Sequence, residues 1–216
     1  MSHASLVGGH VVANSYWIWA GIEETSVPPS DELYVYQGNF FRAKGNLKFE
    51  RKGLFPYPAR AKKVVLVYGL RMLPDVNLIM SVYKNHQERW LAHSVVVVGI
   101  QLDFDSPTQK ISAYADYLAK VRAALPKNHR LSITGLCDWV NGSPPQLQKL
   151  RRNVDEIVFQ LYQSTSHVKN ARQYIRALEQ LKQPYKLGML FGKALDVELG
   201  SMSYLSGIIY FVQRRS

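Results

Sequence analysis

The stretch VVVVGIQLDFDSP, residues 95–107, joins a run of apolar β-branched residues to two aspartates. Side chains alternate along a strand. One face of this strand is then wholly apolar, with Val96, Val98, Ile100, Leu102 and Phe104. The other face is small at its start and polar at its end, with Val95, Val97, Gly99, Gln101, Asp103 and Asp105. We therefore expect a buried strand that packs its apolar face under helices and presents carboxylates at its C-terminal end.

Apolar, β-rich segments of this kind recur along the whole chain. There are eight of them: SYWIWAGI, ELYVYQG, KKVVLVYGLRM, VVVVGIQLDFD, RLSITGLCDWV, DEIVFQLYQ, YKLGMLFG and SGIIYFVQ. Helical spacing of apolar residues lies between several of them, over residues 74–93, 108–125, 145–153 and 168–181. Strands that alternate with helices predict parallel strands joined by crossovers.

Eight such strands predict a closed (β/α)8 barrel of the TIM type, formed by residues 1–216 as one α/β domain. The chain has 216 residues, below the ~250 typical of that fold. The links after the first, second and seventh strands are too short or irregular for full helices, so we expect a trimmed barrel. Residues 38–61 are expected to form a long loop. The alternative architecture is an open doubly wound sheet, which has the same local signals.

The composition describes a basic protein with one sizeable core. The formal net charge is +11, and 47% of the residues are hydrophobic. Such a charge suits an anionic polysaccharide, a nucleic acid or a membrane surface, but the basic residues are scattered, which equally describes a solvated surface. We do not expect nucleic acid as the partner. The longest apolar run is far shorter than the ~20 residues of a membrane span. We therefore expect a soluble chain, periplasmic or secreted if a leader has been removed and otherwise cytoplasmic.

The residue types that bind metals and cofactors are sparse. Cys137 is the only cysteine and is expected to be a small buried hydrophobe in a strand. The six histidines have no metal-ligand spacing, and neither a P-loop nor a GxGxxG motif occurs. We expect no cofactor and no tightly bound metal. The alternative is metal-dependent phosphoryl chemistry, with Mg²⁺ held by Asp103 and Asp105.

Polar and aromatic residues near the ends of other strands join these aspartates as candidates. Active sites of (β/α)8 barrels are built at the C-terminal ends of the strands. Aromatic faces beside carboxylates suit sugar rings. The candidate substrate-binding residues are Gln101, Gln160, Gln163, Arg71, Asp138, Trp139, Trp17 and Trp19, with Tyr162 beside them.

Each candidate also has a structural interpretation. The two aspartates could cap the turn at Ser106 and Pro107. Trp17 and Trp19 could be core residues, and Tyr162 could be a core residue with a satisfied hydroxyl. Arg71 could pair with an inward carboxylate, a role that would also shift the pKa of that carboxylate.

The run GIQLDFDSP, the following ISAYADYLAKVRAALP and LSITGLCDW closely resemble a bacterial family, domain of unknown function 3142, grouped with TIM-barrel glycoside hydrolases. The segments YWIW and FQLYQ fit the same family. A more distant resemblance is to chitinase-like family 18 glycoside hydrolases, whose fourth strand carries DGxDxDxE. Against that motif, Gln101 stands at the first aspartate of DxDxE, Asp103 matches the second, and Asp105 takes the place of the acidic Glu. In the family's MxYD motif, Tyr162 matches and Gln163 replaces the aspartate.

The resemblance implies a glycoside hydrolase that acts on a glycan, with Asp105 as general acid and Asp103 as its charged partner. Tyr162 and Gln160 would then donate hydrogen bonds. Asp138 is the best candidate for a separate base or nucleophile, unless the substrate assists its own hydrolysis. The alternative is a barrel that binds glycan without cleaving it, which the amides of Gln101 and Gln163 favour.

Overall fold

The protein is a closed barrel of eight parallel strands. The computed structural model describes residues 4–7, 10–19, 21–53, 56, 59–142, 144–195, 197–199 and 201–213. Around the barrel the strands follow the order β2, β12, β11, β8, β7, β6, β5 and β3, and a parallel pairing of β2 with β3 closes the ring. Their bounds are β2 (His10–Ile18), β3 (Glu32–Ala43), β5 (Lys63–Leu70), β6 (Val96–Asp103), β7 (Arg130–Leu136), β8 (Glu156–Gln160), β11 (Tyr185–Leu190) and β12 (Leu205–Phe211). The predicted (β/α)8 fold is confirmed, and the open-sheet alternative is wrong.

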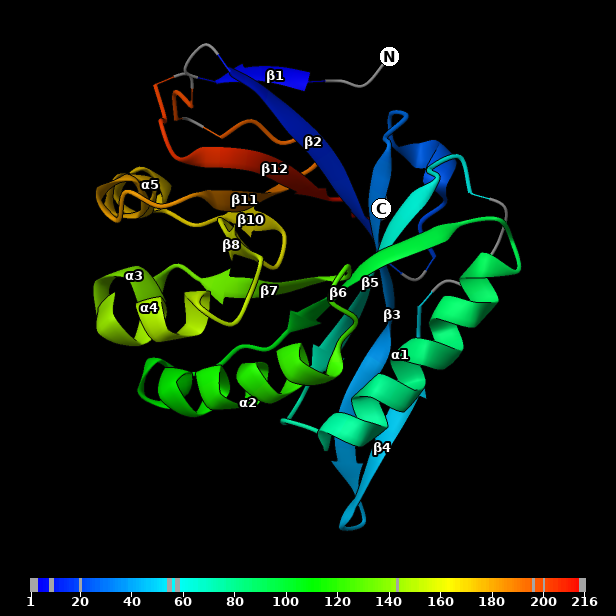
Figure 1. Ribbon diagram of the computed structural model, residues 1–216. Helices are drawn as coiled ribbons and strands as arrows, with labels where there is room; N and C mark the ends of the chain where they lie inside the picture. Colours follow the sequence, from blue (N-terminus) through cyan, green and yellow to red (C-terminus); the bar gives the residue numbers. More distant parts are fainter. Residues whose placement is uncertain are drawn as a thin grey trace.

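Helices cover the outside of the barrel (Figure 1). Four of the barrel strands, β5, β6, β7 and β8, are each followed by a full helical crossover. The helices are α1 (Val76–Leu91), α2 (Ile111–Ala124), α3 (Asp138–Gly142), α4 (Pro144–Arg151) and α5 (Ala171–Gln180). Only the short 3-10 turn η1 (Glu24–Ser26) lies between β2 and β3. In the described residues, no helix separates β3 from β5 or β11 from β12. The barrel is therefore trimmed at the three links where the sequence predicted it.

The helices begin and pack as their sequences predict. Asp75 caps α1, because its carboxylate accepts hydrogen bonds from the backbone N–H groups of Asn77 and Leu78. The apolar stripe of α2 is buried, including Ile111, Leu118 and Val121. No described helix is long and apolar enough to span a membrane.

The long link after the second barrel strand is an ordered hairpin, where the sequence predicted a loop. β3 continues to Ala43, turns at Lys44 and Gly45, and pairs antiparallel with β4 (Asn46–Arg51). Figure 1 shows this hairpin projecting beyond the barrel beside α1. Residues 54–55 and 57–58 of the same link lie outside the described part of the chain. A second antiparallel strand, β1 (Ala4–Val7), pairs with β2.

The fifth barrel strand is shorter than predicted. It ends at Leu136, and Asp138 begins α3, since the chain leaves the barrel mouth to cross toward β8. Cys137 lies in the turn rather than in a strand. Its side chain is a buried free thiol, and burial raises its pKa to about 12, which fits the predicted role of a small hydrophobe.

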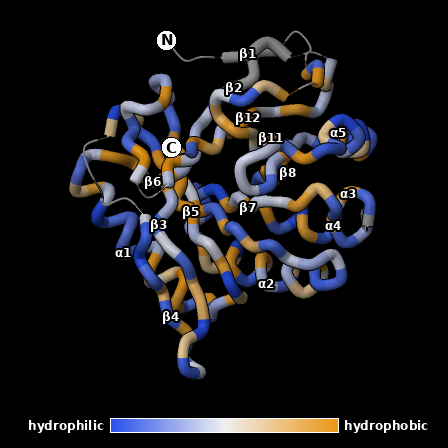
Figure 2. The backbone as a smooth tube through the Cα atoms, turned by 180° about the vertical axis from the view of Figure 1, so that it is seen from behind, coloured by the Kyte–Doolittle hydropathy of each residue, from blue (hydrophilic) through white to orange (hydrophobic). Residues whose placement is uncertain are grey.

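Aromatic and β-branched side chains fill the barrel. The interior cluster consists of Trp17, Tyr34, Tyr36, Val65, Val67, Val158 and Ile209. The indole of Trp17 fits because Gly188 faces it: a Cβ at Gly188 would lie 2.8 Å from two atoms of the ring. A larger outer cluster joins the other strand faces to the helices. Figure 2 shows hydrophobic stretches along the barrel strands and hydrophilic ones recurring along the helices.

A β-bulge corrects the predicted register of β6. Val64 pairs with Val97, but Val65 pairs with Gly99, so one extra residue is inserted. Val97 therefore belongs to the outer cluster and Val98 packs against the interior one, opposite to their predicted faces. Beyond the bulge, Ile100 and Leu102 face the outer core as predicted.

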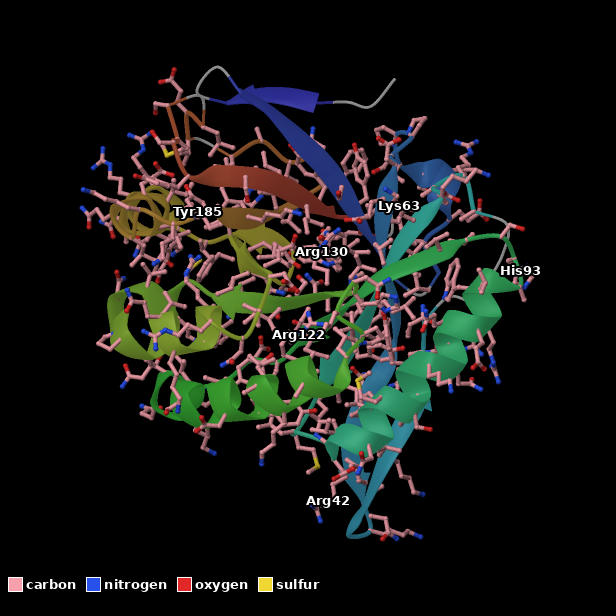
Figure 3. The ribbon with its side chains drawn as sticks, in the orientation of Figure 1. Arg42, Lys63, His93, Arg122, Arg130 and Tyr185 are labelled. Carbon is pink, nitrogen blue, oxygen red and sulfur yellow. The ribbon has the colours of Figure 1, made fainter. Side chains whose placement is uncertain are left out.

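Charged residues close the N-terminal end of the barrel. Arg130 donates to both carboxylate oxygens of Glu32, at 2.8 Å each. Glu156 accepts from Lys186 at 2.5 Å and from the Tyr34 hydroxyl at 2.6 Å. Figure 3 labels Arg130 where these strands begin. In (β/α)8 barrels this end serves stability.

Candidate functional site

A pocket of about 360 Å³ opens at the C-terminal end of the barrel. It is lined by two residues within β3 and by residues at or after the ends of β2, β5 and β6: Trp19, Tyr36, Asn39, Gly69, Leu70, Arg71, Asp103, Phe104 and Asp105. We call it the mouth pocket. It brings together four of the residues singled out in the sequence, namely Trp19, Arg71, Asp103 and Asp105.

Asp103 is the last residue of β6 and points into the barrel mouth. Its Oδ1 accepts a hydrogen bond of 2.7 Å from the Thr134 hydroxyl, and Gln160 donates to the same carboxylate. Burial raises the pKa of Asp103 to about 6, and the nearby Asp105 carboxylate adds to the effect. The hydrogen bonds and the Arg71 guanidinium oppose the rise. Asp103 therefore carries its proton nearer to neutral pH than an ordinary aspartate does.

Asp105 lies in the loop that follows β6, and its side chain is exposed to the pocket. The 3-10 turn η2 (Thr108–Lys110) begins without a side-chain cap, so the capping interpretation of these aspartates does not describe it. The loop is anchored instead by Trp139, whose Nε1 donates to the Ser106 carbonyl oxygen at 2.9 Å.

Aromatic rings form one side of the mouth. Trp19 stacks on Tyr36 with ring centroids 4.0 Å apart, and its edge meets Phe211. Phe211 in turn stacks on Tyr162 at 5.2 Å. Burial, with the charges of Asp103 and Asp105, raises the pKa of Tyr162 well above its usual value, so its hydroxyl stays protonated and can donate.

Gln101 and Trp17 lie deeper, under the mouth pocket. Trp17 Nε1 donates to Gln101 Oε1 at 2.5 Å, and Gln101 Nε2 donates to the Ser132 hydroxyl at 2.8 Å. Gln101 is fully buried and Trp17 is 2% exposed. Both therefore support the floor of the mouth, and the core interpretation of Trp17 holds.

Tyr162 and Gln160 lie beside the mouth pocket, near Asp103, but are not among its lining residues, and three further predicted residues lie away from it. Trp139 is fully buried in the outer core, which rules out a sugar-stacking position and corrects that expectation. Asp138 is exposed on α3 and accepts a hydrogen bond of 2.8 Å from the Tyr174 hydroxyl of α5. Gln163 is exposed in β9 (Tyr162–Gln163), a short strand that pairs with β10 (Ser166–His167).

The structure adds residues that the sequence interpretation missed. Tyr36 and Asn39 line the pocket from β3, and Thr134 holds Asp103 from β7. Tyr34 and Tyr36 are two residues apart on one strand and so share a face, and the same holds for Ser132 and Thr134. This spacing of polar or aromatic residues was the signal of an inward face. Simple alternation puts Asn39 on the face opposite to Tyr36, but β3 changes register between Tyr36 and Gly38, and Asn39 therefore could not be predicted to line the pocket.

Two larger hollows lie elsewhere. One, of about 510 Å³, is at the N-terminal end and is lined by the paired charges of Glu32, Arg130, Glu156 and Lys186. Another, of about 840 Å³, lies between the segments that follow β2, β11 and β12. Within the described ranges, no group of three or more His, Cys, Asp or Glu side chains is arranged to hold a metal ion.

Fold and mouth together define a trimmed (β/α)8 barrel with a carboxylate pair at its C-terminal end. Residues 60–195 match the model of the family described as Domain of unknown function (DUF3142). The match spans more than half of the chain, so the protein belongs to this family, as the sequence resemblance indicated. Among curated proteins, none matches the sequence significantly.

Solved structures share the fold at low sequence identity. A xylanase-A-amylase inhibitor protein has 15% identity, a TM-score of 0.56 and 93% of each chain covered. A putative chitinase A from Streptomyces coelicolor has 11% identity and a TM-score of 0.57, with 93% of this chain and 92% of the other covered. A family 18 chitinase from Crocus vernus has 12% identity and a TM-score of 0.53, with 93% and 91% covered. At these identities the likeness concerns the fold alone, and it confirms the predicted (β/α)8 barrel.

Proposed function

We propose that the protein is a glycoside hydrolase that binds its glycan in the mouth pocket. The observation that carries the proposal is the pairing of Asp103, with its raised pKa, and exposed Asp105 in one pocket with the Trp19 and Tyr36 rings. Glycosidic cleavage needs a carboxyl group that keeps a proton, and an aromatic surface suits the faces of sugar rings.

The two aspartates have different roles in this proposal. Burial and the neighbouring Asp105 carboxylate raise the pKa of Asp103 to about 6, so Asp103 holds a proton nearer to neutral pH and can pass it to Asp105. Asp105, the exposed member, delivers the proton to the leaving oxygen. Asp103, fixed by Thr134 and Gln160, then stabilises the positive charge that develops on the sugar. The protonated Tyr162 hydroxyl donates to the substrate.

Amino sugars are the substrate class to examine first. Among the described residues, no third carboxylate lines the mouth pocket to act as base or nucleophile. Hydrolysis assisted by the substrate's own N-acetyl group requires no such residue. Asp138 is held by Tyr174 on the outer helices, which makes it a poor candidate for this role.

Glycan binding without cleavage is the second candidate. Gln101 stands where the chitinase-like motif has an aspartate, and its amide is already bonded to Trp17 and Ser132. An amide cannot share a proton with Asp103 as a carboxylate would. The same mouth pocket would then hold a glycan that stays intact.

The test is a screen of the wild type for glycan cleavage, followed by Asp105→Asn on any substrate found. General acid assistance is typically worth ~10²- to 10⁴-fold in rate, so we expect kcat to fall on that scale while the Kd of the glycan changes little. Asp116→Asn is the matched control, because Asp116 is exposed on α2 and paired with Lys149. An unchanged rate in Asp105→Asn would contradict the proposed acid. Binding without any cleavage by the wild type would favour the second candidate.

A further inference from the structure

One face of the β3–β4 hairpin continues the wall of the mouth pocket. Tyr36 belongs to the barrel interior, and Asn39 lines the pocket after the change of register. Gly69 makes this position possible, since a Cβ there would lie 2.0 Å from the Asn39 side chain. Alternation then puts Phe41 on the same face as Asn39, about 7 Å farther along the strand.

Phe41 and Lys48 form a pair on this face. They lie directly opposite each other in the antiparallel ladder, so their side chains are neighbours. The opposite face is the one that packs inward, because Phe40 and Phe49 contact each other and Tyr68. Phe41 is partly exposed and, in the described part of the chain, packs against neither core cluster.

The charge on this face is not neutralised within the hairpin. Glu50 lies on the same face, opposite Asn39, but its carboxylate pairs with Lys52 at 2.9 Å, so these two charges offset each other. Lys48 is exposed and has no carboxylate partner among the described residues. Arg71 adds a second exposed positive charge, its guanidinium, in the mouth pocket itself.

We propose that Phe41 and Lys48 form a binding position for an acidic sugar in a glycan that extends from the mouth pocket over the hairpin. The ring of Phe41 would stack on the sugar, and the Lys48 ammonium would pair with a uronic-acid carboxylate. This inference rests on the proposed function for the location of the glycan. It goes further by naming the substrate class, a polymer that contains uronic acid.

The experiment compares two hexasaccharides by calorimetry with the intact protein. Hyaluronan hexasaccharide carries carboxylates, and chitohexaose is neutral, while both contain N-acetylglucosamine. We expect the wild type to bind the hyaluronan probe more tightly. Lys48→Glu should weaken that binding about five-fold or more, since it replaces an attractive charge pair by a repulsive one. Phe41→Ala should weaken it about ten-fold through the lost stacking contact.

Arg42→Glu is the matched control, because it changes the net charge equally within the same hairpin. Arg42, which Figure 3 labels near the tip of the hairpin, pairs with Leu47 on the other face of the ladder. Thermal unfolding of each variant checks that the hairpin is intact. Equal weakening by Arg42→Glu and Lys48→Glu would overturn the proposal, because it would reflect overall charge alone.

The outcomes separate this inference from the hydrolase proposal. If the wild type binds both hexasaccharides equally, the acidic-sugar position is wrong, whether or not the mouth cleaves a glycan. If the wild type prefers the hyaluronan probe, with the expected loss in Lys48→Glu, but cleaves nothing, the binding position is supported and the hydrolase proposal fails.

Discussion

Replacing Asp103 by Asn is expected to stabilise the protein above pH 6 while it impairs the site. The raised pKa means that the folded state binds the Asp103 proton more tightly than the unfolded state does. Between the ordinary value of 3.8 and about 6, the free energy of unfolding of the wild type therefore falls as pH rises. Asn carries no charge at any of these pH values, so it is free of this penalty.

The size of the effect follows from the two pKa values. From their separation, the ionisation of Asp103 lowers the free energy of unfolding of the wild type by about 0.6 kcal/mol at pH 4 and by about 3 kcal/mol at pH 7.5. Because the Asp103 side chain keeps some contact with solvent, we expect the stability advantage of Asp103→Asn to grow by about 2 kcal/mol over this range. For a domain of this length that corresponds to a relative gain in Tm of ~4 to 8 °C.

Thermal unfolding of both proteins from pH 4 to pH 8 measures this gain. Asn preserves the shape of the side chain and can still accept the Thr134 hydrogen bond, and any loss of the Gln160 bond is the same at every pH, so the change with pH isolates the charge. The control is Asp116→Asn, on the exposed face of α2, which should show no gain as pH rises. A Tm difference between wild type and Asp103→Asn that does not change with pH would refute the raised pKa and the reasoning built on it.

Two further predictions concern the rest of the barrel. Glu156→Gln should lower the free energy of unfolding at pH 7, measured by urea titration, by about 2 to 4 kcal/mol. The reason is that Lys186 and Arg130 lose the negative charge that pairs with them at the N-terminal end of the barrel. A loss below about 0.5 kcal/mol would contradict this. Cys137 should resist iodoacetamide at pH 8 in the folded protein and react once it is unfolded, because burial raises the thiol pKa to about 12; rapid labelling of the native protein would show that the thiol is accessible.

The strands could be predicted because two signals depend on local sequence alone: the hydrophobic runs, and the alternation of side chains between the two faces of a strand. All eight segments chosen from the sequence are barrel strands, and Asp103 lies at the mouth as its parity indicated. The bulge in β6 could not be predicted, since four consecutive valines give the same pattern in either register.

The hairpin was missed because its pattern depends on tertiary structure. In NLKFER the alternating charges of Lys48 and Glu50 look like a solvated loop, and the strand forms because Phe49 reaches Tyr68 and Phe40. Trp139 was misjudged for a related reason. Its position beside Asp138 indicated a strand end, but the chain turns into α3 there and buries the indole.

The most direct test of the glycan site at the barrel mouth is a crystal structure of Asp105→Asn soaked with an amino-sugar oligosaccharide. We predict a sugar ring in the mouth pocket, against the aromatic side formed by Trp19 and Tyr36, with a glycosidic oxygen within hydrogen-bond distance of residue 105. An oligosaccharide bound only outside the mouth, for example in the hollow lined by Glu32 and Arg130 at the N-terminal end, would contradict it.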